Sequence, residues 1–93
     1  MHYRIELTPA AEKALVKLAK KDRALMVKID HALLSLAENP MSNNSKRLVG
    51  GEGDLYRLRV GDYRIIYRVE NGQLLVLVVH LGHRKDVYRH LKR

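Results

Sequence analysis

The sequence predicts an α+β fold: an N-terminal strand, a helical hairpin, an antiparallel sheet of three or four strands, and a short C-terminal helix. After a brief alternating stretch, apolar residues recur at helical spacing through the first half of the chain. In the second half, apolar and polar residues alternate between short turn motifs, as they do in strands. Amphipathic helices bury their apolar stripe against another element, so the helical hairpin is expected to cover one face of the sheet.

One strand and two helices are predicted for the N-terminal half. Residues 3–7 alternate in polarity like a half-buried strand, and Thr8-Pro9 provides a helix N-cap followed by proline at the first helical position. Asp22 separates two apolar stripes and can cap the second helix. Asn39-Pro40 ends that helix, because the residue before a proline is pushed out of helical geometry. The polar segment 41–45 is expected to be a loop.

The C-terminal half is predicted to be a meander of strands. Gly61-Asp62 fits a two-residue hairpin loop with glycine first, and Asn71-Gly72 is a strong motif for a second two-residue loop. Residues 73–81 are apolar at nearly every position, which predicts a central strand. Gly82 is expected to end this strand, and residues 87–92 to form the terminal helix.

Length and composition indicate one small globular domain spanning residues 1–93. Hydrophobic residues make up 46% of the chain, and there is no cysteine, which excludes disulfides, thiolate metal sites and cysteine nucleophiles. The longest apolar run, Leu74 to Val79, is too short to cross a membrane, and the N-terminus has no apolar signal core. We therefore expect a soluble, cytoplasmic protein that does not bind a membrane.

The charge of the chain is strongly positive and unevenly distributed. The net charge is +8, and residues 46–93 hold eleven Lys or Arg against five Asp or Glu, compared with seven against five in residues 1–45. Such a basic field favours a polyanionic partner, either a nucleic acid or an acidic protein. A solvated surface charge that only improves solubility is the alternative.

The two hairpin loops predict that arginines gather on one face of the sheet. A loop at positions 61 and 62 sets Arg59 opposite Arg64, with Arg57 two residues back on the same face. Like charges opposite one another are destabilising, so this face needs an anion or must be well solvated. A two-residue loop at positions 71 and 72 would set Arg64 opposite Val79, and the following segment 82–85 would then pass beside Arg59 and Arg64.

These residue types are suited to chemistry on a phosphodiester. Arginine offers a planar fork of donors to phosphate oxygens and stabilises the extra negative charge of a transition state. His83 could exchange a proton at neutral pH, and Tyr88 could stack on a base. His80, His83 and His90 could instead suggest a metal site, but three histidines without cysteine or a carboxylate cluster make a poor zinc signature. We expect neither a metal ion nor another cofactor.

The sequence resembles the RelE toxins of the RelE/ParE toxin–antitoxin superfamily over essentially its whole length. The resemblance is carried by three blocks, KRLVG at 46–50, LYRLRVGDYRIIY at 55–67 and GHRKDVY at 82–88. It implies the RelE-like fold and a metal-independent endoribonuclease that cleaves mRNA, on the ribosome in its A site. In such toxins the 2′-hydroxyl attacks the adjacent phosphate and leaves a 2′,3′-cyclic phosphate.

The resemblance also implies a set of site residues. Arg57 and Arg64 would brace the transition state, Arg84 would serve the leaving oxygen, and Tyr88 would hold the substrate nucleotide. The best-known RelE pattern has lysines where this chain has Arg57 and Arg59, and arginine is a poor base because it scarcely deprotonates. Arg59 would then stabilise charge, and His83 becomes the candidate acid or base. Four further basic residues are expected to bind RNA: Lys46, Arg47, Arg68 and Lys85.

Two other functions are compatible with the same pattern. A ParE-like inhibitor of DNA gyrase shares the fold and much of the 57–67 hairpin but cuts no nucleic acid. A catalytically inactive RNA-binding module is the third possibility, if the arginine face lacks proton-transfer partners. For the toxin, the resemblance implies a cognate antitoxin that blocks the basic face in a hetero-oligomer; the mRNA and the ribosome are the other expected partners.

Overall fold

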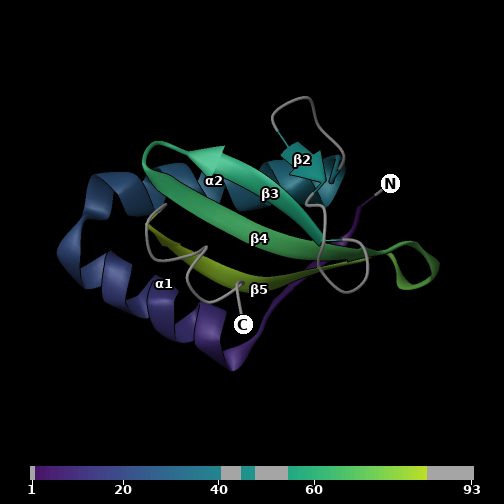
Figure 1. Cartoon of the computed structure of the whole chain (residues 1–93), viewed down its shortest axis with the longest axis horizontal. Coiled ribbons are helices and arrows are strands. Elements are labelled where there is room, and N and C mark those ends of the chain that lie inside the picture. Colours follow the sequence, from purple (N-terminus) through teal and green to yellow (C-terminus); the bar gives the residue numbers. More distant parts are fainter. Residues whose placement is uncertain (1, 41–44, 48–54, 84–93) are drawn as a thin grey trace.

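A computed structural model of the chain describes residues 2–40, 45–47 and 55–83 (Figure 1). Its elements are, in chain order, β1 (Arg4–Leu7), α1 (Pro9–Lys21), α2 (Arg23–Glu38), β2 (Ser45–Arg47), β3 (Leu55–Val60), β4 (Tyr63–Glu70), a 3-10 turn (Asn71–Gln73) and β5 (Leu75–His83). Within these ranges, no helix is long and apolar enough to cross a membrane. The predicted C-terminal helix lies outside the described residues.

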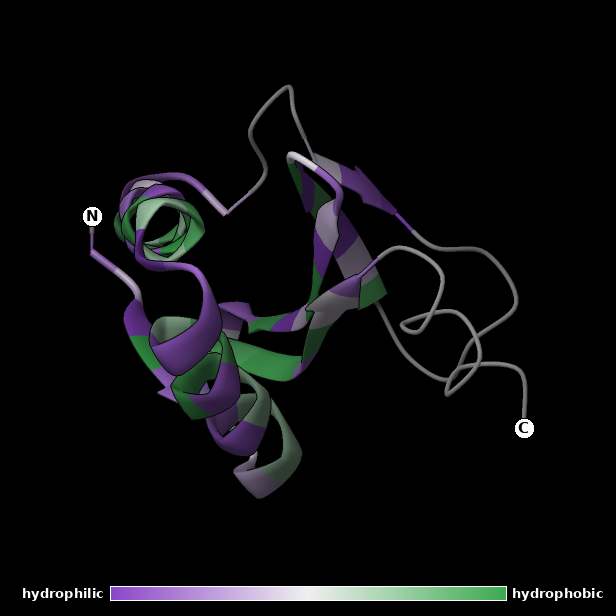
Figure 2. Ribbon diagram, turned by 90° about the vertical axis from the view of Figure 1, so that its left-hand side faces the viewer, coloured by the Kyte–Doolittle hydropathy of each residue, from purple (hydrophilic) through white to green (hydrophobic). Residues whose placement is uncertain are grey.

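The five strands form one sheet in the order β1-β5-β4-β3-β2. β1 runs parallel to β5, and the other three neighbouring pairs are antiparallel. Both helices lie on the same side of the sheet, where α1 packs against β5 (Figure 2). The α+β fold predicted from the sequence is therefore confirmed, with the N-terminal strand joining the sheet beside the last strand.

The predicted helix starts are confirmed by side-chain caps. The Thr8 hydroxyl accepts a hydrogen bond from the backbone N–H of Ala11 at 3.2 Å, and Pro9 is the first helical residue. The Asp22 carboxylate accepts one from the N–H of Leu25 at 3.1 Å and so begins α2 directly after α1 ends. The expected loop at 41–45 is wrong at its last residue, because Ser45 pairs with Leu58 as the start of β2.

The core lies between the helices and the inner face of the sheet. Ile29 and Leu36 of α2 belong to one core cluster with Ile65 and Tyr67 of β4, and each of the four is at least 99% buried. The Tyr67 hydroxyl donates a hydrogen bond to the Pro40 carbonyl at 2.6 Å, which satisfies its polar atom inside the core. Burial is the main reason why the pKa of Tyr67 is raised above its ordinary value of 10.0.

The first hairpin has the register predicted from its turn. Arg59 pairs with Arg64 across a loop at positions 61 and 62. Gly61 has a φ of +58°, in the left-handed region that glycine adopts without a steric penalty.

The second hairpin differs from its prediction by three residues, because Arg64 pairs with Gly82 and not with Val79. The loop has four residues, since a 3-10 turn begins at Asn71 and Leu74 follows with a φ of +50°. Contacts from outside the hairpin hold this longer loop. Tyr3 donates to the Asn71 side chain at 2.7 Å, and the N–H of Arg4 donates to the Leu74 carbonyl at 2.7 Å.

The longer loop accounts for two of the three residues by which the observed pairing differs from the prediction, and a β-bulge in β5 accounts for the third. Tyr67 pairs with Val78, but the preceding Ile66 pairs with His80, so Val79 is left over between them. The bulge lets β5 present both Val78 and Leu81 to the core, although three positions separate them. Nor does Gly82 end the strand as expected, because β5 continues through His83.

Candidate functional site

Basic side chains line the sheet face that points away from the helices. The register assigns Arg57 and Arg59 of β3 and Arg64 and Arg68 of β4 to this face, because their neighbours Leu58, Ile65 and Tyr67 belong to the helix-side core. One row across the sheet runs Arg59–Arg64–Gly82, and the next runs Lys46–Arg57–Ile66–His80. We call this surface the arginine face.

Arg64 is buried in the middle of the arginine face. Its side chain is only 7% exposed, and its Nε is buried without a hydrogen-bond partner. Its guanidinium donates to the carbonyl of the adjacent Tyr63 at 3.4 Å. Among the residues that the structure describes, the one ion pair is Arg4–Glu6 on β1, so no described carboxylate neutralises Arg64. A buried guanidinium in this state is set up to receive an anion.

Ile66 forms an apolar centre among these charges. It is completely buried, yet it lies outside the helix-side core cluster. Its same-face neighbours are Arg64 and Arg68 along β4, and Arg57 and His80 directly across on the two adjacent strands. A ligand that bound over Ile66 would therefore lie against an apolar side chain with basic side chains around it.

The two histidines of β5 lie on opposite faces of the sheet. His83 pairs with Tyr63, and their rings make an edge contact at 6.0 Å, so His83 lies on the side of Tyr63, which packs against the core. The expectation that His83 joins Arg59 and Arg64 on one face is therefore not met. The bulge brings His80 to the arginine face instead, which sequence reasoning missed. The apolar run 74–79 shows no alternation, so the sequence carried no signal for the bulge.

The remaining predicted site residues divide into three groups. Lys46 pairs with Arg57 and thus belongs to the arginine face, as does Arg68. Arg47 pairs with Tyr56 and is assigned to the opposite face of the edge strand. Three predicted site residues lie outside the described part of the chain: Arg84, Lys85 and Tyr88.

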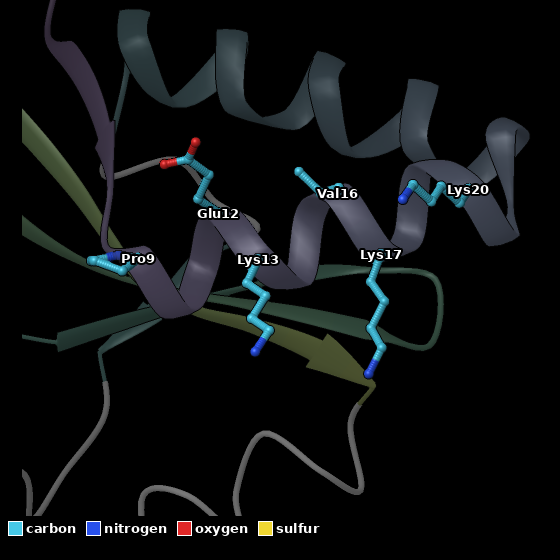
Figure 3. Close-up of a pocket in the computed structure, with 6 residues that line it drawn as sticks. All are labelled: Pro9, Glu12, Lys13, Val16, Lys17 and Lys20. Carbon is cyan, nitrogen blue, oxygen red and sulfur yellow. The ribbon is translucent and has the colours of Figure 1, made fainter.

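The outer surface of α1 carries a second feature, a shallow open hollow (Figure 3). Figure 3 shows Val16 pointing toward α2, while Lys13 and Lys17 point away from it. Val16 is 51% exposed, and the lysines around it are exposed as well. The hollow holds no buried polar group among its lining residues, so its features are those of a solvated helix surface. Its lining residues are Pro9, Glu12, Lys13, Val16, Lys17 and Lys20.

The fold and the site together define a small basic α+β protein with a buried arginine on the sheet face that points away from the helices. Comparison with known proteins narrows this class. Residues 5–88 match the family described as the ParE toxin of the type II toxin-antitoxin system, parDE. The chain belongs to this family and is a RelE-type toxin of the RelE/ParE superfamily, part of a type II toxin–antitoxin system.

Named relatives support the RelE side of the superfamily. Toxin RelE of Mycobacterium tuberculosis is 30% identical over 92 residues, covering 94% of this chain and 87% of the relative. Toxin RelG of the same organism is 28% identical over 89 residues, covering 96% and 99%. The RelE chain in the archaeal RelE–RelB complex from Pyrococcus horikoshii superposes with a TM-score of 0.76 at 30% identity, covering 90% and 97%.

Proposed function

We propose that this toxin is an endoribonuclease that cleaves mRNA in the ribosomal A site without a metal ion. The 2′-hydroxyl would attack the adjacent phosphorus, and the bond from phosphorus to the 5′ oxygen would break. The products would be a 2′,3′-cyclic phosphate and a free 5′-hydroxyl. This chemistry needs charge stabilisation and proton transfer, because the nucleophile is part of the substrate itself.

The observation that carries the proposal is the state of Arg64. Arg64 is only 7% exposed, and its buried Nε has no hydrogen-bond partner. Its guanidinium can therefore donate a hydrogen bond to an acceptor that binds there. A phosphodiester supplies two anionic oxygens in the geometry that a guanidinium binds. The charge on those oxygens rises toward the pentacoordinate transition state, so the interaction would strengthen as the reaction proceeds.

Other basic residues would share the work around Arg64. Arg59 lies directly opposite Arg64, and Arg57 lies one row away on the same face, where both would stabilise developing charge. Lys46 and Arg68 extend the positive surface along the RNA backbone on either side. The roles that the resemblance implies for Arg84 at the leaving oxygen and Tyr88 at the nucleotide complete the proposed site.

We further propose that a cognate antitoxin neutralises this protein by covering the arginine face. The P. horikoshii relative was solved as a RelE–RelB complex, and another, at 26% identity, as the RelBE2 toxin–antitoxin complex of M. tuberculosis. An acidic antitoxin segment would complement the net charge of +8 and supply the carboxylates that the described residues do not offer to Arg64.

The test is to induce the chain alone in cells and map mRNA 5′ ends. We expect new cuts within translated codons, which an Arg64→Met variant produces at least about 10²-fold more slowly because it loses a donor to the transition state. Arg23→Met is the matched control, since Arg23 is an exposed arginine at the start of α2. Intact mRNA in growth-arrested cells would refute the proposal.

Inhibition of DNA gyrase is the second candidate, because the matching family is described by its ParE member. A gyrase inhibitor would bind its target without cutting RNA, and induction would cause DNA damage with intact mRNA. The same induction experiment therefore separates the two functions.

A further inference from the structure

The arginines of the arginine face cannot act as the base that the proposed cleavage needs. Cleavage by a 2′-hydroxyl requires a group that removes its proton, and arginine stays protonated at any physiological pH. In the described ranges, the register assigns two carboxylates to this face, Glu70 of β4 and Glu6 of β1. Glu70 is six residues from Arg64 along β4, about 20 Å at the rise of a strand, and Glu6 is ion-paired with Arg4 on β1.

His80 is the titratable group that stands beside Arg64 and Ile66. It pairs directly with Ile66, and Arg64 is its diagonal neighbour on β4, at a Cα separation of about 7–8 Å for such pairs. The described charged groups facing it are Arg64 and Arg68 from β4 and, beyond Ile66, Arg57 from β3.

On its other side, His80 lies past the end of β1, where the nearest described charge on the same face is Glu6, which pairs with Leu77 and is ion-paired with Arg4. The last β1 pair joins Leu7 to Val78, and the neutral Thr8 hydroxyl donates to the Val79 carbonyl at 3.1 Å. His80 is half-buried, so it sits at the boundary between the dry centre at Ile66 and solvent. A proton taken up there has a route to water.

The β-bulge is the device that places His80 on the arginine face. Without the extra residue at Val79, strict alternation after Val78 would send His80 to the core and Val79 to the arginine face. Bulges re-aim side chains in this way and occur frequently next to active sites. The bulge interrupts the strand pairing at Val79. At this position it replaces an apolar side chain on the arginine face with the imidazole of His80, beside Arg64.

We infer that His80 is the general base of the reaction; the inference rests on the proposed ribonuclease function. The neutral imidazole takes the proton of the 2′-hydroxyl while the 2′ oxygen forms its bond to phosphorus. The bond from phosphorus to the 5′ oxygen breaks, the electron pair stays on that oxygen, and water protonates it. The imidazolium then returns its proton to the hydroxide so formed, so the enzyme is unchanged.

The experiment measures single-turnover cleavage of a defined mRNA on programmed ribosomes across about pH 5–8, the range in which histidine titrates. The variants are His80→Gln, His80→Ala and His83→Gln, the last on the opposite face of the same strand, and His31→Gln, at an exposed histidine of α2, is the matched control. We expect both His80 variants to be about 10²–10⁴-fold slower and to lose the rise of rate with pH, while His31→Gln stays within about threefold of wild type. Added imidazole is expected to restore cleavage to His80→Ala, which a structural role would not allow.

The outcomes separate the inference from the function on which it rests. Wild-type cleavage with an unchanged rate and pH profile in His80→Gln would overturn the inference and leave the ribonuclease intact. Loss of activity in His83→Gln but not in His80→Gln would assign proton transfer to the strand end and overturn it equally. Wild-type protein that leaves the mRNA whole would overturn the proposed function and the inference together.

Discussion

Each face of the central sheet buries a polar side chain, Tyr67 on the helix side and Arg64 on the arginine face, but the two differ in their hydrogen bonds. On the helix side, Tyr67 is fully buried and its hydroxyl bonds to the Pro40 carbonyl at 2.6 Å. On the arginine face, Arg64 is nearly as buried, yet its Nε has no partner and no described carboxylate balances its charge. Two residues of β4 that are three positions apart are thus buried in opposite states, one with its polar group hydrogen-bonded and one with a polar atom unsatisfied.

The difference indicates what each face is for. A satisfied buried hydroxyl adds to the stability of the fold, whereas an unneutralised buried cation subtracts from it. Removing such a charge often leaves stability unchanged or raises it. The buried charge on the arginine face therefore lowers the stability of the fold but allows the face to bind an anion. The packing on the helix-side face compensates for this loss of stability.

The largest expected effect compares two adjacent isoleucines, one on each face. Ile65→Ala is expected to lower the free energy of unfolding by about 2–5 kcal/mol, because Ile65 is fully buried within the helix-side core cluster. Ile66→Ala should cost less than Ile65→Ala, since the long side chains of Arg57 and Arg68 beside it are flexible and can collapse into the space. Urea unfolding of both variants measures the difference. Equal losses would mean that the two faces are packed alike.

The next effect separates stability from activity at Arg64. Arg64→Met is expected to lower mRNA cleavage by about 10²–10³-fold, equivalent to about 2.7–4 kcal/mol of transition-state stabilisation. The same variant should keep or raise the free energy of unfolding, because it removes a buried charge that has no counter-ion among the described residues. Urea unfolding and a cleavage assay on one preparation check both. A strongly destabilised variant would show that Arg64 is a structural residue.

A smaller effect is expected from removing the Tyr67 hydroxyl on the helix-side face. Tyr67→Phe leaves the Pro40 carbonyl without its donor and should cost about 1–3 kcal/mol of stability with cleavage unchanged. Tyr3→Phe is the comparison, because the Tyr3 hydroxyl bonds to Asn71 at an exposed site. A loss no greater than that of Tyr3→Phe would argue that the Pro40 carbonyl finds water.

Tyr67 also gives the helix-side face a pH dependence. Its pKa is raised in the folded protein above 10.0, mainly by burial, so the neutral phenol is the form that the fold favours. The stability this provides is fully present below the pKa of the unfolded chain and is lost as the pH rises above it. Wild type should therefore lose more stability between about pH 9 and 11 than Tyr67→Phe does. Parallel curves for the two proteins would contradict this.

The smallest expected effect lies in the helix layer. Asp22→Ala removes the acceptor for the Leu25 N–H at 3.1 Å and should cost about 1 kcal/mol. Cleavage should not change, because α2 covers the helix-side face and lies away from the arginine face (Figure 2). Asp30→Ala, an exposed mid-helix position, is the control for general effects of removing an acid. A fall in cleavage would indicate that the two faces are coupled.

Local chemistry in the sequence determined much of this protein. The Thr8 and Asp22 caps, the stop at Asn39-Pro40 and the tight turn at Gly61 were predictable, because each depends on interactions within a few residues. The pairing of Arg59 with Arg64 followed from that turn alone, so three members of the arginine face, Arg57, Arg59 and Arg64, were predicted correctly.

Only the tertiary structure decided the register of the last strand. Asn71-Gly72 favours a two-residue loop locally, but contacts with Tyr3 and Arg4 of the distant N-terminus hold a longer one. The nearly uniform apolar run of β5 concealed the bulge, because alternation is invisible where every residue is hydrophobic. The bulge moved His83 to the core side and His80 to the arginine face, and the longer loop, held by contacts between residues about 70 positions apart, set the position of His80 along β4. Neither feature has a local pattern in the sequence, and the bulge decided which histidine shares the face with the arginines.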